Sequence, residues 1–305
     1  MTENQFEFVK VDETASEHLS APRYSYWKAT LRQFFGKKTT IFMLIIAVTI
    51  IAIAMIQPLL SHYNPIEMPN ILDGSKKFLP PSLEYLFGTD QNGNNLFDAT
   101  WAGAQTSILI GFISTIIVMV LGIVVGAIWG FSKTVDKFMI EIYNVVSNIP
   151  YQLLVIILVY VIGRGFWPLV FALTVTTWIS VAYSIRVQVM IIRDREYNLA
   201  SQTLGTPLLR MITKNILPYL VSVIVTMVTN YIPSFISTEV FLSWLGIGLP
   251  EQVASLGRLI SRYTPFITTY PHLFWIPVGV LALITISLYV LGQSLGDASD
   301  PRTHR

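Results

Sequence analysis

Long apolar runs separated by shorter polar stretches dominate the chain. The first run covers residues 39–60 and carries no charged side chain. As a helix it would be about 30 Å long at 1.5 Å per residue, which matches the hydrocarbon thickness of a bilayer. Five further stretches are predominantly apolar. We therefore predict an all-α membrane protein with six transmembrane helices, at about 39–60, 105–131, 138–162, 169–186, 219–240 and 273–291.

Mixed segments flank and interrupt these runs. Residues 25–38 combine four large apolar side chains on one helical face with four cations, which is typical of an interfacial helix on an anionic leaflet; a simple basic flank of the first span is the alternative. Residues 241–271 are too polar to span but apolar enough to dip into the membrane as a re-entrant scoop. The apolar residues of the first segment are Trp27, Leu31, Phe34 and Phe35, and its cations are Lys28, Arg32, Lys37 and Lys38.

The Lys and Arg residues are distributed unevenly over this topology. With a cytosolic N-terminus, fifteen of the 20 lie in cytosolic segments and five in external ones. By the positive-inside rule, this asymmetry predicts that both termini are cytosolic. We expect a cytosolic N-terminal segment at 1–38 and a six-helix transmembrane domain at 39–305. Within that domain, 61–103 and 241–271 would be external, and 194–218 would be a cytosolic loop.

Composition and motifs exclude several kinds of protein. Charged residues make up only 12% of the chain, about half the usual soluble share, and there is no cysteine to form disulfides or thiolate metal sites. The four histidines lack ligand spacing, so no metal site is predicted. Residues 36–39 resemble the end of a phosphate-binding loop, but Leu31 stands where its first glycine is required. Neither an enzyme nor a nucleic-acid partner is expected.

Charged side chains inside the spans are also scarce. The acids are Glu141 and Glu239, both near span ends. Ion-coupled carriers generally need such groups at membrane depth, so their scarcity argues against ion-driven transport. Any energy source should then belong to another chain. The second span places Gly122, Gly126 and Gly130 on one face, which predicts close packing against another helix.

The third predicted span is more polar than the others. Glu141, Asn144 and Asn148 share one helical face, and Tyr151 follows shortly after. Polar side chains at membrane depth usually face a protein interior or a water-filled path. Asn144, Asn148 and Tyr151 are therefore candidates for lining a translocation path, and hydrogen bonding between helices is the alternative.

One polar, basic stretch at 196–218 interrupts the apolar pattern and predicts two short helices. Gly205 is the expected C′ residue of the first, because glycine enters the left-handed region without steric cost. Thr206 would then be the N-cap and Pro207 the first residue of the second helix, and Pro218 would close the unit. A helix–Gly–helix unit between spans, without catalytic residues, predicts a docking element.

This stretch resembles the cytosolic coupling loop of ABC-importer permeases. Ala200 and Ser201 stand at the two alanines of that loop, Gly205 at its glycine, and Leu217-Pro218 at its Leu-Pro. Further motifs are similar to those of dipeptide/oligopeptide importer permeases of the OppC/DppC type, closest to the AmiD branch, over about residues 25–305. They are Pro58-Leu59-Leu60 with Tyr63 and Pro65, Phe87-Gly88-Thr89-Asp90-Gln91, Asn148-Ile149-Pro150 with Leu153-Leu154, Glu239 with Leu242-Ser243, Leu245-Gly246 and Gly248, and Asp297 with Asp300-Pro301-Arg302.

The resemblance implies a type I, MetI-like permease fold and a subunit of an ATP-driven oligopeptide importer in a bacterial plasma membrane. It implies as partners a second homologous permease, two cytosolic ATPases that bind the ATP and Mg, an extracellular lipid-anchored peptide-binding protein, the peptide and membrane lipid. No cofactor would be bound by this chain. The coupling residues it implies are Glu196, Ala200, Ser201, Gly205, Thr206, Pro207, Leu208 and Arg210.

The sequence departs from the family pattern at two places. Leu199 replaces the usual acid of the coupling loop, and Glu196, nearly on the same helical face, is the candidate substitute. Gly93-Asn94-Asn95 replaces a Gly-Arg-Asp in the first external segment, so an external Arg contact is not expected. Import of nickel or another small solute is the alternative within the fold. An ion-coupled carrier or a structural scaffold is the alternative from another class.

Overall fold

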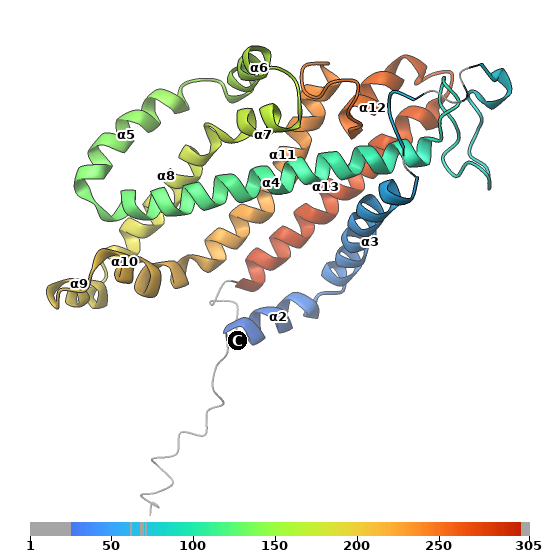
Figure 1. Ribbon diagram of the computed structural model, residues 1–305. Helices are drawn as coiled ribbons and strands as arrows, with labels where there is room; N and C mark the ends of the chain where they lie inside the picture. Colours follow the sequence, from blue (N-terminus) through green and yellow to red (C-terminus); the bar gives the residue numbers. More distant parts are fainter. Residues whose placement is uncertain (1–25, 62, 68–69, 71, 300–305) are drawn as a thin grey trace, which may run out of the picture.

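Helices form nearly all of the apolar runs in the computed structural model, which describes residues 26–61, 63–67, 70 and 72–299 (Figure 1). The long helices are joined by short turns, except for the irregular stretch before residue 96. The α-helices are α2 (Tyr26–Gly36), α3 (Lys38–Ser61), α4 (Leu96–Phe131), α5 (Lys133–Ser147), α6 (Tyr151–Ile162), α7 (Phe166–Thr174), α8 (Thr177–Arg193), α9 (Glu196–Thr203), α10 (Leu208–Arg210), α11 (Val221–Trp244), α12 (Leu256–Tyr263) and α13 (Pro271–Ser299).

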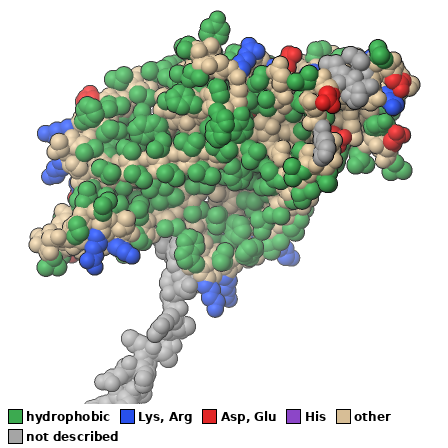
Figure 2. Space-filling view, viewed as in Figure 1, with side chains coloured by type: hydrophobic (Ala, Val, Ile, Leu, Met, Phe, Trp, Pro, Cys, Tyr) green, Lys and Arg blue, Asp and Glu red, His purple; other side chains and the backbone are tan. Residues whose placement is uncertain are grey.

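Five helical segments in the described residues are long and apolar enough to cross a membrane, and a bent pair of helices brings the number to six. The prediction of an all-α membrane protein is thereby confirmed, with five or six candidate spans against the six predicted. The five segments are Lys38–Ser61, Leu96–Phe131, Phe166–Arg193, Leu208–Trp244 and Pro271–Ser299. Figure 2 shows hydrophobic side chains over the middle of one face, with most of its Lys and Arg side chains at the left and lower edges.

The stretch predicted as the third span, over about 138–162, is this bent pair and not one continuous helix. The pair α5 and α6 meets at an angle of 84°. Pro150 has no backbone N–H and disfavours helical dihedrals in the residue before it, which ends α5 and lets α6 start in a new direction. The mean hydropathy of residues 138–162 does not reveal this change of direction.

The most extensive contact between two helices in the described residues is the seam between α4 and α8. A Cβ on Gly126 would collide with the Ala182 carbonyl and lie 2.8 Å from Cβ of Ile185, and a Cβ on Gly130 would lie 2.7 Å from the Arg186 carbonyl oxygen. The two helices therefore approach as closely as their backbones permit. This confirms that the small face of α4 packs against another helix.

A second hydrophobic cluster joins α3, α4, α11, α12 and α13. Its fully or nearly fully buried members include Ala54, Ile108, Ile236, Leu256 and Ile284, one from each helix. Since five helices meet in this cluster, α11 and α13 are held side by side along most of their length, as Figure 1 shows.

The N-terminal helix α2 is separate from the first span and packs against α13. Phe34 is buried, whereas Trp27, Leu31 and Phe35 are about half exposed. Lys37 forms an ion pair of 3.1 Å with Asp297. A helix over the predicted interfacial segment is confirmed, and its placement on a lipid surface stays a prediction.

The stretch before α4 folds onto α12. Asp90 is fully buried and accepts hydrogen bonds from the backbone N–H groups of Asn92 and Asn94 and, at 3.2 Å, from the hydroxyl of Tyr263. Asn95 caps α4, which begins about nine residues before the predicted second span. The predicted external segment 61–103 therefore contains the first turns of α4, and its external location stays a prediction.

Candidate functional site

The segment at 194–218 begins with α9, which is fixed to the end of α8 by one buried side chain. Asn198 is fully buried, and its Nδ2 donates to the carbonyl oxygen of Ile192 at 2.8 Å. Arg193 in turn donates from Nη1 to the carbonyl oxygen of Gly130 at 2.9 Å, which ties the same end of α8 to α4. Asn198 was not among the predicted site residues, because nothing in the neighbouring sequence distinguishes a buried asparagine from an exposed one.

An ion pair at the junction of α8 and α9 supports this arrangement. The Arg193 guanidinium donates to Asp194 from Nε at 2.7 Å, and this hydrogen bond lowers the pKa of the Asp194 carboxyl. The carboxyl is mostly exposed, so solvent screening leaves the pair a small contribution to stability.

The turn after α9 has the geometry predicted for Gly205. Its φ is +75°, and it follows the C-cap residue Leu204. The N–H of Thr206 donates to the Ser201 carbonyl oxygen at 3.1 Å, and that of Gly205 donates to the Gln202 carbonyl oxygen at 3.0 Å. These two bonds define a Schellman motif, and the prediction that Gly205 is the C′ residue is confirmed.

The second helix starts one residue later than predicted. Pro207 is extended (φ −67°, ψ 148°) and occupies the N-cap position, so the predictions of Thr206 as N-cap and Pro207 as first helical residue were wrong. Helix α10 begins at Leu208. Proline at the N-cap leaves no side-chain cap, and the carbonyl oxygen of Pro207 accepts the N–H of Met211 at 3.0 Å.

Pro218 does not close the unit, contrary to the prediction. A π-helical turn (Met211–Ile216) and a 3₁₀ turn (Leu217–Leu220) carry the chain from α10 into α11 without a break in helical character. The N–H of Leu217 donates to the Ile212 carbonyl oxygen, five residues back. This wider turn accommodates a proline, which has no N–H to donate and would clash in a regular helix.

The inner side of this segment belongs to the hydrophobic core that surrounds the α4–α8 seam. Met211 and Ile216 are fully buried together with Val189 of α8. Asn215 Nδ2 also reaches Ser201 Oγ at 3.4 Å, which joins the two halves of the segment. The segment is therefore packed as one body with the ends of α8 and α11.

The outer side of this segment is exposed and partly apolar. Leu204 is 85% exposed and Leu209 is 72% exposed, and both lie outside the long apolar part of the spans. These two leucines were not among the predicted site residues, although their positions near Gly205 and Pro207 were an available signal. Figure 1 shows α9 and α10 at one tip of the molecule. Exposed apolar side chains grouped with turn residues are typical of a protein-binding surface.

The predicted coupling residues occupy this tip. Ser201 and Thr206 are half-buried, and the other six are exposed, as is Leu199. The structure thus brings the set together on one accessible surface. The exposed residues are Glu196, Ala200, Gly205, Pro207, Leu208 and Arg210.

The three candidate path residues surround the bend between α5 and α6. Asn144 and Asn148 are exposed, and the Asn148 amide donates to the Asn144 carbonyl oxygen. Tyr151 is half-buried, and its hydroxyl donates to the Leu173 carbonyl oxygen of α7 at 3.3 Å. The first two therefore share a surface, whereas Tyr151 turns toward the core. Their role along a path stays a prediction.

Metal ligands do not gather anywhere in the part of the chain that the structure describes, where no three His, Asp or Glu side chains lie close enough to hold an ion. The side chains at the tip are of the kinds that bind another protein. The tip offers exposed leucines, a fixed turn and the exposed cations Arg195, Arg210 and Lys214, with α8 and α11 leading directly from it into the spans.

Comparison with protein families assigns the class of protein. A family described as binding-protein-dependent transport system inner membrane component matches residues 122–305, and the N-terminal TM domain of oligopeptide transport permease C matches residues 25–81. The chain belongs to this family of transport permeases, which have the MetI-like fold, and it is a transport subunit rather than an enzyme.

Individual relatives cover nearly the whole chain. It is 56% identical to the oligopeptide transport system permease protein AmiD of Streptococcus pneumoniae, over 99% of this chain and 98% of the relative. It is 35% identical to the oligopeptide transport system permease protein OppC of Bacillus subtilis, over 99% and 98%. The dipeptide transport system permease protein DppC of Bacillus subtilis is 33% identical, over 95% and 90%.

Proposed function

We propose that this chain is a transmembrane subunit of an ATP-driven ABC importer that moves oligopeptides into the cell. It would form half of the translocation path and couple to a cytosolic ATPase through the 194–218 segment. The tip itself carries the proposal, because exposed leucines and a fixed turn stand directly on helices that continue into the spans. The names of the AmiD and OppC relatives support oligopeptides as the cargo.

The proposal includes the other members of the assembly. A second homologous permease would complete the path, two cytosolic ATPases would bind ATP and Mg, and an extracellular lipid-anchored protein would deliver the peptide. The family description, which names a binding-protein-dependent system, supports the last of these. The predicted cytosolic location of both termini is part of the proposal, and it would put the tip on the ATPase side of the membrane.

The proposed mechanism is alternating access. Closure of the two ATPases on ATP would move the tip, and α8 and α11 would transmit the movement because they share its hydrophobic core. Nickel or small-solute import is not favoured, since the relatives are named as peptide permeases and no cluster of metal ligands is found in the described residues.

The variant Gly205→Asp tests the coupling role. A side chain on Gly205 would meet no atom of this chain within 4 Å, and Asp tolerates left-handed dihedrals better than most residues. The fold should therefore persist while a charged side chain is added to the tip. We expect normal membrane levels, loss of peptide uptake and loss of co-purification with the ATPase.

Gly246→Asp is the matched control for ATPase association. Gly246 also has a left-handed backbone, with φ of +77°, and no neighbour within 4 Å, but it lies just after α11, away from the tip. This control should retain the ATPase. Normal uptake and normal ATPase association by Gly205→Asp would contradict the coupling role.

A further inference from the structure

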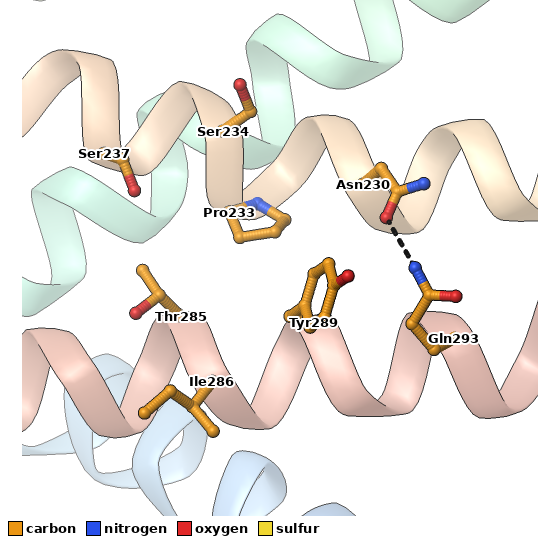
Figure 3. Close-up of a pocket in the computed structure, with 8 residues that line it drawn as sticks. All are labelled: Asn230, Pro233, Ser234, Ser237, Thr285, Ile286, Tyr289 and Gln293. Atoms are coloured by element: carbon orange, nitrogen blue, oxygen red, sulfur yellow. Dashed lines mark hydrogen bonds between the residues drawn. The ribbon is translucent and has the colours of Figure 1, made fainter.

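The groove between α11 and α13 is lined by uncharged polar side chains (Figure 3). Its volume is about 640 Å³, within the range of ligand-binding pockets. Asn230 and Gln293 face each other across it and are joined by a hydrogen bond of 3.5 Å. Helix α11 contributes Asn230, Pro233, Ser234 and Ser237, and α13 contributes Thr285, Ile286, Tyr289 and Gln293.

These polar groups lie within helices that are long and apolar enough to span the membrane. Ser234, Ser237 and Tyr289 are exposed, and in the part of the chain that the structure describes their hydroxyls have no hydrogen-bond partner. Lipid tails offer no partner either, and polar side chains at membrane depth therefore face protein, water or a solute. The groove consequently needs a polar occupant.

The groove continues beyond this hollow. A second hollow of about 540 Å³ shares Ser237 and Thr285 with the first and extends to Trp244 and Phe274. From Phe274 to Gln293 along α13 the distance is about 28 Å at 1.5 Å per residue, which is close to the ~30 Å hydrocarbon thickness. The two hollows together therefore form a track as long as the membrane is thick, with most of its polar groups in the first hollow and mainly apolar side chains in the second.

The walls of the track are held in place. A Cβ on Gly296 would lie 2.6 Å from Oγ1 of Thr226, and one on Gly292 would collide with Thr229, so α11 and α13 are packed backbone to side chain behind the polar lining. The separation of the two helices that carry the lining is therefore fixed by close packing.

We propose that this track binds the main chain of a peptide in transit. The inference rests on the proposed function, peptide import, and adds the surface that contacts the cargo. The amides of Asn230 and Gln293 offer a donor and an acceptor together, as a peptide bond does. On α13 the polar groups at 285, 289 and 293 repeat about every 6 Å, near the ~6.7 Å two-residue repeat of an extended chain.

A track of this kind selects for a backbone and not for side chains. No Lys, Arg, Asp or Glu belongs to the lining of either hollow. Peptides of either charge would therefore meet the same hydrogen-bonding groups and no fixed charge. This arrangement suits cargo of varied sequence, and it differs from a site that holds an ion or a particular side chain.

Single cysteines test the occupant directly, since the chain has no cysteine of its own. We would introduce Ser234→Cys or Ser237→Cys in the assembled transporter and label it with a water-soluble thiol reagent. This chain would then be isolated and the fraction of it that carries the label measured. We expect both positions to react and a transported peptide to slow the reaction at least fivefold. Leu283→Cys is the control, because Leu283 is exposed on α13 but does not line the track.

The outcomes separate the possible occupants. No labelling at either serine position, or cross-linking of both to the second permease, would overturn the track and assign this face to lipid or to a subunit interface. Labelling that the peptide does not slow would overturn it as well. Peptide uptake by the transporter without cysteine substitutions separates the two proposals. No uptake would contradict the proposed function. Normal uptake, together with labelling that the peptide does not slow, would contradict the track alone.

A charged variant gives a second test. Asn230→Asp keeps the side-chain shape and adds a negative charge to the track. We expect uptake of Glu-rich peptides to fall at least about tenfold relative to Lys-rich peptides of equal length, because opposed like charges are strongly unfavourable. An equal change for both peptides would contradict passage along this track. Leu283→Asp would control for a charge placed on α13 outside it.

Discussion

The α4–α8 seam and the α5–α6 pair differ in how they are held. At the seam, nearly half of the residues in the most apolar part of α4 are buried. The glycines of α4 let the backbone of α8 approach closely. No residue of α5 is buried. The seam is therefore stabilised by close packing along its whole length, whereas α5 depends on a few contacts at one place.

The contacts that hold α5 are polar and aromatic. Asp136 forms an ion pair with Arg186 and accepts a hydrogen bond from Trp129 Nε1 at 2.8 Å. Tyr143 stacks on Tyr183 with ring centroids 4.1 Å apart. Contacts of this kind break one by one, while a packed seam separates only as a unit. We infer that α8 can transmit movement from the tip, and that α5 is displaced more easily than the helices of the seam.

Gly126→Ala should have the largest effect on the protein as a whole, because it breaks the seam, whereas the later variants act on one helix. The added Cβ would collide with the Ala182 carbonyl, which belongs to the backbone and cannot rotate away. We expect a loss of about 1–3 kcal/mol in the free energy of unfolding. Thermal unfolding of the purified protein would show the loss as a lower midpoint. We also expect a lower level of the variant in the membrane.

Gly279→Ala is the matched control, since Gly279 also lies within a spanning helix but has no atom within 4 Å of its would-be Cβ. Alanine is the better helix former, by about 1 kcal/mol, so the control should be neutral or stabilising. Equal unfolding midpoints for the two variants would contradict the close approach of α4 and α8.

What the sequence could predict follows the same division. The seam was predictable because a glycine every fourth residue has a direct meaning for helix packing. Gly205 was predictable for a similar reason, since its left-handed turn is fixed by the local chain. Both features depend on residues a few positions apart, and both are present in the structure.

Contacts between distant residues were missed, and so were two local features at prolines. Asp136 and Arg186 are 50 positions apart, so nothing in either neighbourhood announces their pairing. The bend at Pro150 was missed because the apolar run continues through it. Pro218 was taken as a helix end because the wider π turn that accommodates it has no sequence signature. The polar lining between α11 and α13 likewise appears only when the two helices are placed side by side.

Asp136→Asn should release α5 while leaving the seam intact. The neutral amide cannot pair with the Arg186 guanidinium, and hydrogen bonds to charged groups contribute about 1.5–3 kcal/mol. We expect amide hydrogen exchange in α5 to accelerate about tenfold or more, with exchange in α4 and α8 unchanged. Glu141→Gln is the control, because Glu141 is exposed on the same helix and has no ion pair among the described residues. Unchanged exchange in α5 would show that packing, and not the ion pair, holds it.

Tyr151→Phe should have the smallest effect, because it removes one neutral hydrogen bond between α6 and α7. The hydroxyl of Tyr151 donates to the Leu173 carbonyl oxygen at 3.3 Å, and a bond of this kind contributes about 0.5–1.5 kcal/mol. We expect exchange in α6 to accelerate by less than Asp136→Asn accelerates it in α5. Tyr160→Phe on the same helix is the control, since Tyr160 is 87% exposed. If both variants behave alike, α6 is held by Val155 and Val159 in the core, and the two halves of the bent span are anchored by different means.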